Sequence, residues 1–203
     1  MVVAIKLFEY GPTRSLKCRW ALQEAGLDYE SIGNSPEVLT LGELGNIHPL
    51  GKVPAILIDG KPLFESSAIV TAVADLVPAL DLVAHHGTWE RHIHDQWTAF
   101  AATELEIWAW CAMLNTREFL RSADKQVPEI VDQNRELFQR AAGALENVLG
   151  TQPYMMGESF SVTDIIVAYP LYLGQEVGFL KGFSMLEEYV QRLHSRPYCT
   201  FQL

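Results

Sequence analysis

The dipeptide Val53-Pro54, which opens the apolar run of residues 55–58, constrains the fold of this chain more than any other feature. Proline lacks the amide that a sheet ladder needs, so Pro54 suits the first position of a strand. A cis bond before Pro54, which is a rare arrangement, would hold the amide and carbonyl of Val53 facing outward. These two groups would then pair with an extended peptide, as in strand addition.

A second signal lies at Glu65-Ser66, where a strand gives way to a helix. Ser66 is a typical N-cap residue, and the unpaired amides and positive dipole end of a helix attract a carboxylate. Together with Val53-Pro54, this helix start predicts a site for a small peptide that carries both an amine and a carboxylate.

The first part of the chain alternates strand and helix signals. We expect strands over residues 5–10, 29–32, 55–58 and 62–64, helices over residues 15–25 and 66–76, and a short irregular helix within residues 34–46. Gly26 stands where the first helix ends, and Asp59-Gly60 is a strong hairpin signal. The order is β-α-β-α-β-β-α, with the first strand pair parallel and the last antiparallel.

Residues 79–87, which follow Pro78, have the character of a linker between two domains. The first domain then covers residues 1–78, and the second, residues 88–203, carries only amphipathic helix patterns. We expect its helices over residues 88–120, 128–149 and 185–194, with a further helix that follows Ser161 and ends near residue 177. Ser161 and Asp164 form a capping box at the start of that helix.

The composition excludes several classes of function. The net charge of -10, without any basic stripe, argues against a nucleic-acid partner. No apolar run is long enough to span a bilayer and no signal sequence is visible, so we expect a cytoplasmic protein without a membrane partner. The three cysteines show no C-x-x-C spacing, and Cys18 falls on a buried helical stripe. The histidines show no H-E-x-x-H spacing, and no metal site is expected.

These motifs resemble the cytosolic glutathione transferase superfamily, in particular its bacterial-type members with a Ser/Thr-type active-site turn. The matching segments are Gly51-Lys52-Val53-Pro54 and Glu65-Ser66-Ser67-Ala68-Ile69, and Ser161 with Asp164 is similar to the capping box of that family. The resemblance implies an α/β thioredoxin-like N-terminal domain with a mixed four-stranded sheet, followed by an all-α helical-bundle domain. It also implies a homodimer that uses glutathione as cosubstrate and needs no other cofactor.

The resemblance assigns roles in binding glutathione to five residues and to Pro54 beside them. Val53 would pair its backbone with the cysteinyl unit, and Glu65 and Ser66 would hold the amine and carboxylate of the γ-glutamyl unit. Lys52 and His48 would reach the glycine carboxylate. Two alternatives stay open, because Lys52 would also suit a solvated turn and His48 would also suit a hydrogen bond within its loop.

The residue that activates the thiol should lie in the turn after the first strand, where the family uses Ser, Thr, Tyr or Cys. Alignment places Pro12 nearest to that position, and a shift of one residue reaches Thr13, our first candidate. Ser15 and Tyr10 follow, although Ser15 would also suit an N-cap and Tyr10 a strand-end aromatic. Lowering a thiol pKa by about two units requires nearly 3 kcal/mol, which one hydroxyl and a helix end supply.

The second substrate would be a hydrophobic electrophile in an apolar pocket between the domains, with Phe8, Trp108 and Trp110 as candidate contacts. The predicted function is therefore glutathione transfer, in which the activated thiol attacks small hydrophobic electrophiles. One alternative is a glutathione-dependent disulfide or peroxide reductase of the same fold. Another is a binding or scaffold protein that keeps the fold without the chemistry.

Overall fold

The computed structural model describes residues 3–201 and divides the chain into two compact units. The first unit groups Met1–His85 with Pro197–Leu203, and the second is His86–Arg196. The division expected from the sequence left the last residues in the helical domain. The structure groups them differently because Thr200 donates a hydrogen bond to the carbonyl of Leu16 at 2.7 Å.

Four strands form the sheet of the first unit, in the order β2-β1-β3-β4. They are β1 (Ile5–Glu9), β2 (Glu30–Gly33), β3 (Ala55–Ile58) and β4 (Lys61–Phe64). Strand β1 pairs parallel with β2 and antiparallel with β3, and β3 pairs antiparallel with β4, as predicted.

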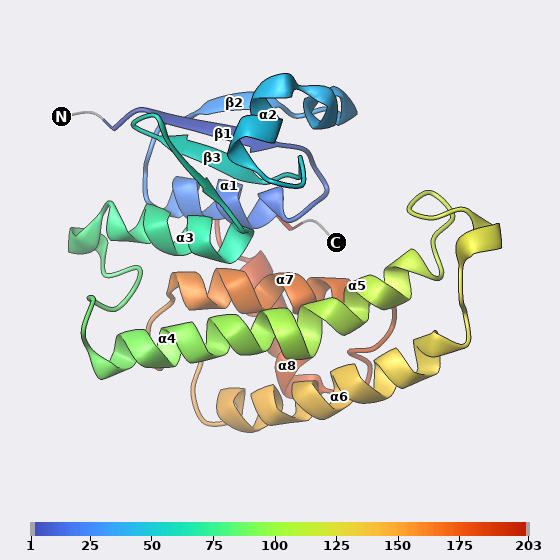
Figure 1. Cartoon of the computed structure of the whole chain (residues 1–203). Helices are drawn as coiled ribbons and strands as arrows, with labels where there is room; N and C mark the ends of the chain where they lie inside the picture. The colour runs from blue at the N-terminus through green and yellow to red at the C-terminus, as the bar shows by residue number, and fades with distance from the viewer. Residues whose placement is uncertain (1–2, 202–203) are drawn as a thin grey trace. The chain divides into compact units, whose positions relative to one another are not determined.

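Three helices cover this sheet, and Figure 1 shows α1 and α3 on the side opposite α2. Their bounds are α1 (Ser15–Glu24), α2 (Gly42–Ile47) and α3 (Ser66–Asp75), with 3-10 turns η1 (Pro36–Thr40) and η2 (Pro78–Leu80). The first unit is thus a thioredoxin-like βαβαββα domain.

The sheet core explains why β1 is apolar along most of its length. Leu7 and Phe8 point to opposite faces and are both fully buried, because helices cover each side. On the α2 side, Phe8 packs into a cluster with Val38, Leu44, Ile47 and Ala55.

Both turn signals of the first unit are confirmed. Asp59 and Gly60 have φ angles of 49° and 75°, the left-handed pair that a tight type I′ hairpin requires. Gly26, with φ 62°, follows the C-terminal end of α1, where the amide of Leu27 donates to the carbonyl of Leu22 at 3.1 Å.

The second unit is entirely helical within the described residues. Its elements are α4 (Trp89–Phe100), a π-helical segment η3 (Ala101–Glu106), α5 (Ile107–Leu114), a 3-10 turn η4 (Ala123–Lys125), α6 (Ile130–Leu149), α7 (Val162–Glu176) and α8 (Ser184–His194). Across residues 3–201, no helix is both long and apolar enough to cross a membrane.

The long helix made by α4, η3 and α5 ends at Leu114, earlier than the residue 120 expected from the sequence. Asn115 accounts for the end. Its side-chain amide donates to the carbonyl of Cys111 at 2.7 Å, and its side-chain oxygen accepts from the amide of Val127 at 2.8 Å. The side chain therefore ties the following loop back to the helix.

The predicted capping box at the start of α7 is present. The buried Asp164 carboxylate accepts hydrogen bonds from the amide of Ser161 at 2.8 Å and from its hydroxyl at 3.2 Å. It also accepts from the amide of Met155 at 2.8 Å and from the hydroxyl of Tyr189 at 2.7 Å. One side chain thus joins α7, the preceding loop and α8.

Candidate active site

The turn between β1 and α1 carries the three candidate hydroxyls and is held by its own side chains. The amide of Tyr10 donates to the hydroxyl of Ser15 at 3.2 Å, and the amide of Ser15 donates to the hydroxyl of Thr13 at 3.2 Å. The Thr13 hydroxyl lies 3.0 Å from that of Ser15 and also donates to the carbonyl of Tyr10. These bonds fix the path of the chain from strand to helix.

The three candidates differ in exposure. Ser15 is fully buried and is the first residue of α1, while Arg14 occupies the N-cap position, so the N-cap alternative for Ser15 is wrong by one residue. Thr13 and Tyr10 are half-buried. The ring of Tyr10 packs against the cluster around Phe8. Thr13 is therefore partly accessible to solvent, whereas Ser15 is not.

The peptide bond between Val53 and Pro54 is cis. Pro54 is buried, whereas Val53 is half-buried and precedes β3. Among the described residues, neither the amide nor the carbonyl of Val53 has a hydrogen-bond partner. Both main-chain groups are therefore available to an extended peptide, since the ladder of β1 and β3 begins only at Ala55.

The loop before Val53 contains two candidate residues, the buried His48 and the exposed Lys52. His48 is only 7% exposed, and its Nδ1 accepts a hydrogen bond from the amide of Leu50 at 3.1 Å. Its ring centroid lies 5.0 Å from that of Phe64. Lys52 is exposed and, within residues 3–201, forms no hydrogen bond or ion pair. Lys52 is thus the available cation of this loop.

The start of α3 differs by one residue from the expectation that Ser66 is the N-cap. Glu65 holds that position, because its carbonyl accepts from the amide of Ile69 at 2.9 Å while its φ is 70° and its ψ 112°. A φ of this sign is uncommon outside glycine and is often found at binding sites. Ser66 becomes the first helical residue and is buried, and the exposed Glu65 carboxylate makes no side-chain cap bond.

The N-terminal amides of α3 are unpaired within residues 3–201. The first amides of a helix have no intrahelical partner, and those of Ser66, Ser67 and Ala68 form no other hydrogen bond among the described residues. The first turn of α1 differs, because the amides of Leu16 and Lys17 donate to the carbonyls of Thr13 and Arg14 at 3.0 and 3.2 Å. The free helix end therefore lies at α3.

Phe8 and Cys18 belong to the interior of the first unit. Phe8 is fully buried in the core cluster, so it offers no surface to an electrophile, and its assignment as an electrophile contact is corrected here to a core position. Burial raises the pKa of the Cys18 thiol to about 12, which leaves it protonated and unreactive at neutral pH. Its sulfur lies 3.9 Å from the carbonyl of Ser66.

The other two aromatic candidates lie on α5 in the second unit. Trp108 and Trp110 are both half-buried, and the indole Nε1 of Trp108 is buried without a hydrogen-bond partner in the described part of the chain. No group of three or more His, Cys, Asp or Glu side chains among residues 3–201 is arranged to hold a metal ion.

Two charged residues beside the candidate turn were not identified from the sequence. Glu9, the last residue of β1, is 2% exposed and pairs with Arg19 of α1. The guanidinium of Arg19 fills the space where a side chain at Gly11, in the turn, would lie. A carboxylate at the end of a mostly apolar strand was the available signal, since a buried charge requires a partner.

Comparison with known proteins agrees with this geometry. Residues 3–75 match the model of the glutathione S-transferase N-terminal domain, and residues 100–197 match that of the C-terminal domain. Glutathione S-transferase GstA of Escherichia coli O157:H7 is 26% identical over 95% of this chain and 94% of its own length. The structure of a sphingomonad glutathione S-transferase complexed with glutathione is 26% identical, with a TM-score of 0.82 over 96% of this chain and 94% of that one.

Elongation factor 1-gamma 1 of Oryza sativa subsp. japonica is also 26% identical, over 97% of this chain. The chain spans 47% of that protein and between 35% and 45% of three other elongation factor 1-gamma relatives. Both family models, the order of the elements and the thioredoxin-like sheet lead to one conclusion: the chain belongs to the glutathione S-transferase superfamily.

Proposed function

We propose that this protein is a glutathione transferase, which binds glutathione on its first unit and activates the thiol for attack on a hydrophobic electrophile. The observation that carries the proposal is the unpaired main chain of Val53, next to Pro54 and in the same domain as the free N-terminal amides of α3. The sphingomonad relative, complexed with glutathione, supports the choice of ligand.

Each part of the tripeptide has a complementary group in this domain. The cysteinyl unit pairs with the amide and carbonyl of Val53, in the manner of an added strand. The γ-glutamyl carboxylate accepts from the amide and hydroxyl of Ser66 at the positive end of α3, and the γ-glutamyl amine faces the Glu65 carboxylate. The free ammonium of Lys52 reaches the glycine carboxylate, while His48 supports the loop through its bond to Leu50.

Thr13 is the proposed donor to the thiolate. Its hydroxyl proton turns from the carbonyl of Tyr10 to the sulfur when glutathione binds, while the amide of Ser15 continues to donate to its oxygen. A hydrogen bond to a charged group contributes about 1.5–3 kcal/mol, and one pKa unit corresponds to about 1.4 kcal/mol. Thr13 alone therefore lowers the thiol pKa by one to two units, from about 8.5. The reaction uses no cofactor besides glutathione.

The electrophile is proposed to contact Trp108 and Trp110 of α5, which expose apolar surface in the second unit. We also propose a homodimer. Leu50 and Phe64, which are 71% and 38% exposed in the first unit, are apolar side chains that a partner subunit would cover. A cytoplasmic location agrees with the three free cysteines, Cys18, Cys111 and Cys199.

A pH titration of bound glutathione tests this function. The thiolate absorbs in the ultraviolet, so its absorbance in the complex reports the thiol pKa, and calorimetry reports binding. We expect a thiol pKa of about 6.5–7.5 in the complex, together with conjugation of a model aryl halide. A protein that binds no glutathione at millimolar concentration contradicts the proposal.

A substrate comparison and the same thiol titration separate two other functions. Greater turnover with hydroxyethyl disulfide than with aryl halides would indicate a glutathione-dependent disulfide or peroxide reductase. A binding or scaffold role is favoured by the elongation factor 1-gamma relatives and by the engagement of the Thr13 hydroxyl within its own turn. Glutathione binding with an unshifted thiol pKa would select that role.

A further inference from the structure

A buried ion pair joins the two elements that the candidate turn connects, β1 and α1. Glu9, at the end of β1, is 2% exposed, and both of its carboxylate oxygens are engaged. One oxygen accepts from Nε of Arg19 on α1, and the other accepts from the hydroxyl of Ser31 on β2. The arginine side chain is 20% exposed, so the pair is largely shielded from solvent.

The pair is part of a closed ring of hydrogen bonds. Arg19 donates through Nη2 to the side-chain oxygen of Asn34, and the amide of Asn34 donates to the carbonyl of Glu9 at 2.9 Å. Asn34 has a left-handed φ of 53°, which fixes its side chain beyond the end of β2. The ring therefore locks together the ends of β1 and β2 and the middle of α1.

The guanidinium also lies beside the turn that contains Thr13. A Cβ on Gly11 would lie 3.4 Å from Nη1 of Arg19 and 3.7 Å from Nη2, so the guanidinium occupies the space toward which a side chain at Gly11 would point. The remainder of the turn is held by the bonds among Tyr10, Thr13 and Ser15. The turn therefore has two supports: its own hydrogen bonds, and the ion pair that fixes Glu9, the residue directly before Tyr10.

We infer that Arg19 and Glu9 are positioning residues for thiol activation, because they set the place of the turn that presents the Thr13 hydroxyl. The inference rests on the proposed function and extends it to residues outside the glutathione-binding segments. Displacement of a catalytic group by about 1 Å costs up to about a hundredfold in rate. The guanidinium of Arg19 holds Glu9 and Asn34 from two nitrogens of one rigid fork, whereas an ammonium is a single point donor on a flexible stem.

The nearby titratable groups do not account for activity changes between pH 5 and 9. Tyr29 and Cys18 lie near the pair, and burial raises the pKa of each above its ordinary value. Both groups stay neutral over that range. Lys17, the other charge near Cys18, is buried on α1. A shift in the pH profile therefore reports the glutathione thiol.

The test compares Arg19→Lys with the wild type by thiol titration, calorimetry and chemical denaturation. We expect Arg19→Lys to bind glutathione within about threefold of wild type, because the binding groups lie on other segments. We expect the thiol pKa of the complex to rise by about one unit, so that turnover at pH 6.5 falls about tenfold and recovers at pH 9. Glu9→Gln should shift the same profile in the same direction.

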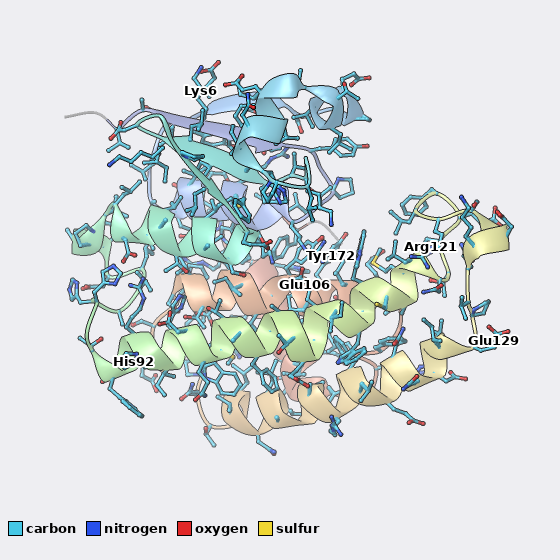
Figure 2. All side chains as sticks on the ribbon, viewed as in Figure 1. Lys6, His92, Glu106, Arg121, Glu129 and Tyr172 are labelled. Atoms are coloured by element: carbon cyan, nitrogen blue, oxygen red, sulfur yellow. The ribbon has the colours of Figure 1, made fainter. Side chains whose placement is uncertain are left out.

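Lys6→Gln is the matched control. It breaks the ion pair of Lys6 with Glu30, which joins the same two strands at 3.1 Å but is exposed, with side chains 49% and 58% accessible. Figure 2 shows Lys6 pointing away from the sheet. This variant should keep the wild-type thiol pKa and turnover.

The outcomes are distinguishable. An Arg19→Lys protein with the wild-type thiol pKa and pH profile overturns the positioning role, whatever its stability, and leaves the proposed function intact. A wild-type complex with an unshifted thiol pKa overturns the proposed function and the positioning role together. If Arg19→Lys is too unstable to assay, Glu9→Gln supplies the same comparison, and an unshifted profile there overturns the inference equally.

Discussion

The hydroxyl of Ser15 accepts a hydrogen bond from the amide of Tyr10 at 3.2 Å, across the turn that joins β1 to α1. Ser15 is fully buried, so no solvent replaces this acceptor when the side chain is shortened. This hydrogen bond supports the turn, while Thr13 is the residue proposed to meet the ligand.

Ser15→Ala should lower the free energy of unfolding by about 1–3 kcal/mol, because the part-buried amide of Tyr10 loses the acceptor that the described residues provide for it. Urea denaturation measures this change. Ser195→Ala is the control, since the hydroxyl of Ser195 donates to the carbonyl of Arg192 at 2.7 Å on the exposed surface. Equal losses for the two variants would contradict the supporting role of Ser15.

Thr13→Val should raise the thiol pKa of bound glutathione by one to two units, because valine keeps the shape and removes the donor. Turnover at pH 6.5 should then fall about ten- to a hundredfold. Thr13→Ser keeps the hydroxyl and should retain most of the wild-type turnover. A Thr13→Val complex whose thiol pKa equals that of wild type would transfer the donor role to Tyr10 or to Ser15.

Lys52→Met should weaken glutathione binding about five- to twentyfold, because one charge-assisted hydrogen bond to a carboxylate is worth about 1–2 kcal/mol at an exposed position. The thiol pKa of the bound ligand should not change. Lys125→Met, on the 3-10 turn of the second unit, removes another exposed lysine and should leave affinity unaltered. Calorimetric titration compares the three proteins, and unchanged affinity in Lys52→Met refutes the assignment.

Asp164→Asn should destabilise the second unit by about 2–4 kcal/mol, because one oxygen that accepts hydrogen bonds becomes an amide donor facing other donors. Burial raises the pKa of Asp164 above its ordinary value, so the folded state holds the proton more tightly than the unfolded state. Its contribution to stability is then full below about pH 3.9 and declines as pH rises through the folded pKa.

The difference in unfolding free energy between wild type and Asp164→Asn should therefore shrink as pH rises from 4 toward 7. Denaturation at several pH values gives this difference. Asp124→Asn, at an exposed position, serves as the control. A difference that grows with pH would show that the hydrogen bonds to Asp164 outweigh its burial.

Phe201→Ala should destabilise the first unit by about 3–5 kcal/mol, since Phe201 is 3% exposed and its ring meets that of Trp20 with centroids 5.2 Å apart. Tyr198→Ala, four residues after His194 and 49% exposed, is the control and should cost little. Urea denaturation followed by tryptophan fluorescence measures both. A small loss for Phe201→Ala would mean that the C-terminal residues do not support the first unit.

Local signals in the sequence predicted most of the fold. The left-handed hairpin at Asp59 and Gly60, the helix end at Gly26 and the capping box of Ser161 depend on a few neighbouring residues, so the sequence displays them directly. The end of the long helix at Leu114 could not be read in this way. It depends on the bond between Asn115 and Val127, twelve residues apart.

The candidate site shows the same limit. Val53, Lys52 and the start of α3 could be proposed from the sequence, because each depends on a local backbone pattern or on a single charge. The pairing of Glu9 with Arg19 depends on the way α1 packs against the sheet, and the burial of Phe8 depends on α2. Tertiary packing determines these contacts. The periodicity of a sequence predicts helices and strands, but it does not predict which of them pack together.

A crystal structure of the protein with glutathione is the most direct measurement of the central claim. The account predicts that the cysteinyl backbone pairs with the amide and carbonyl of Val53, and that the sulfur lies within about 3.5 Å of the Thr13 hydroxyl. Glutathione bound elsewhere, or with its sulfur beyond hydrogen-bonding reach of Thr13, would contradict it.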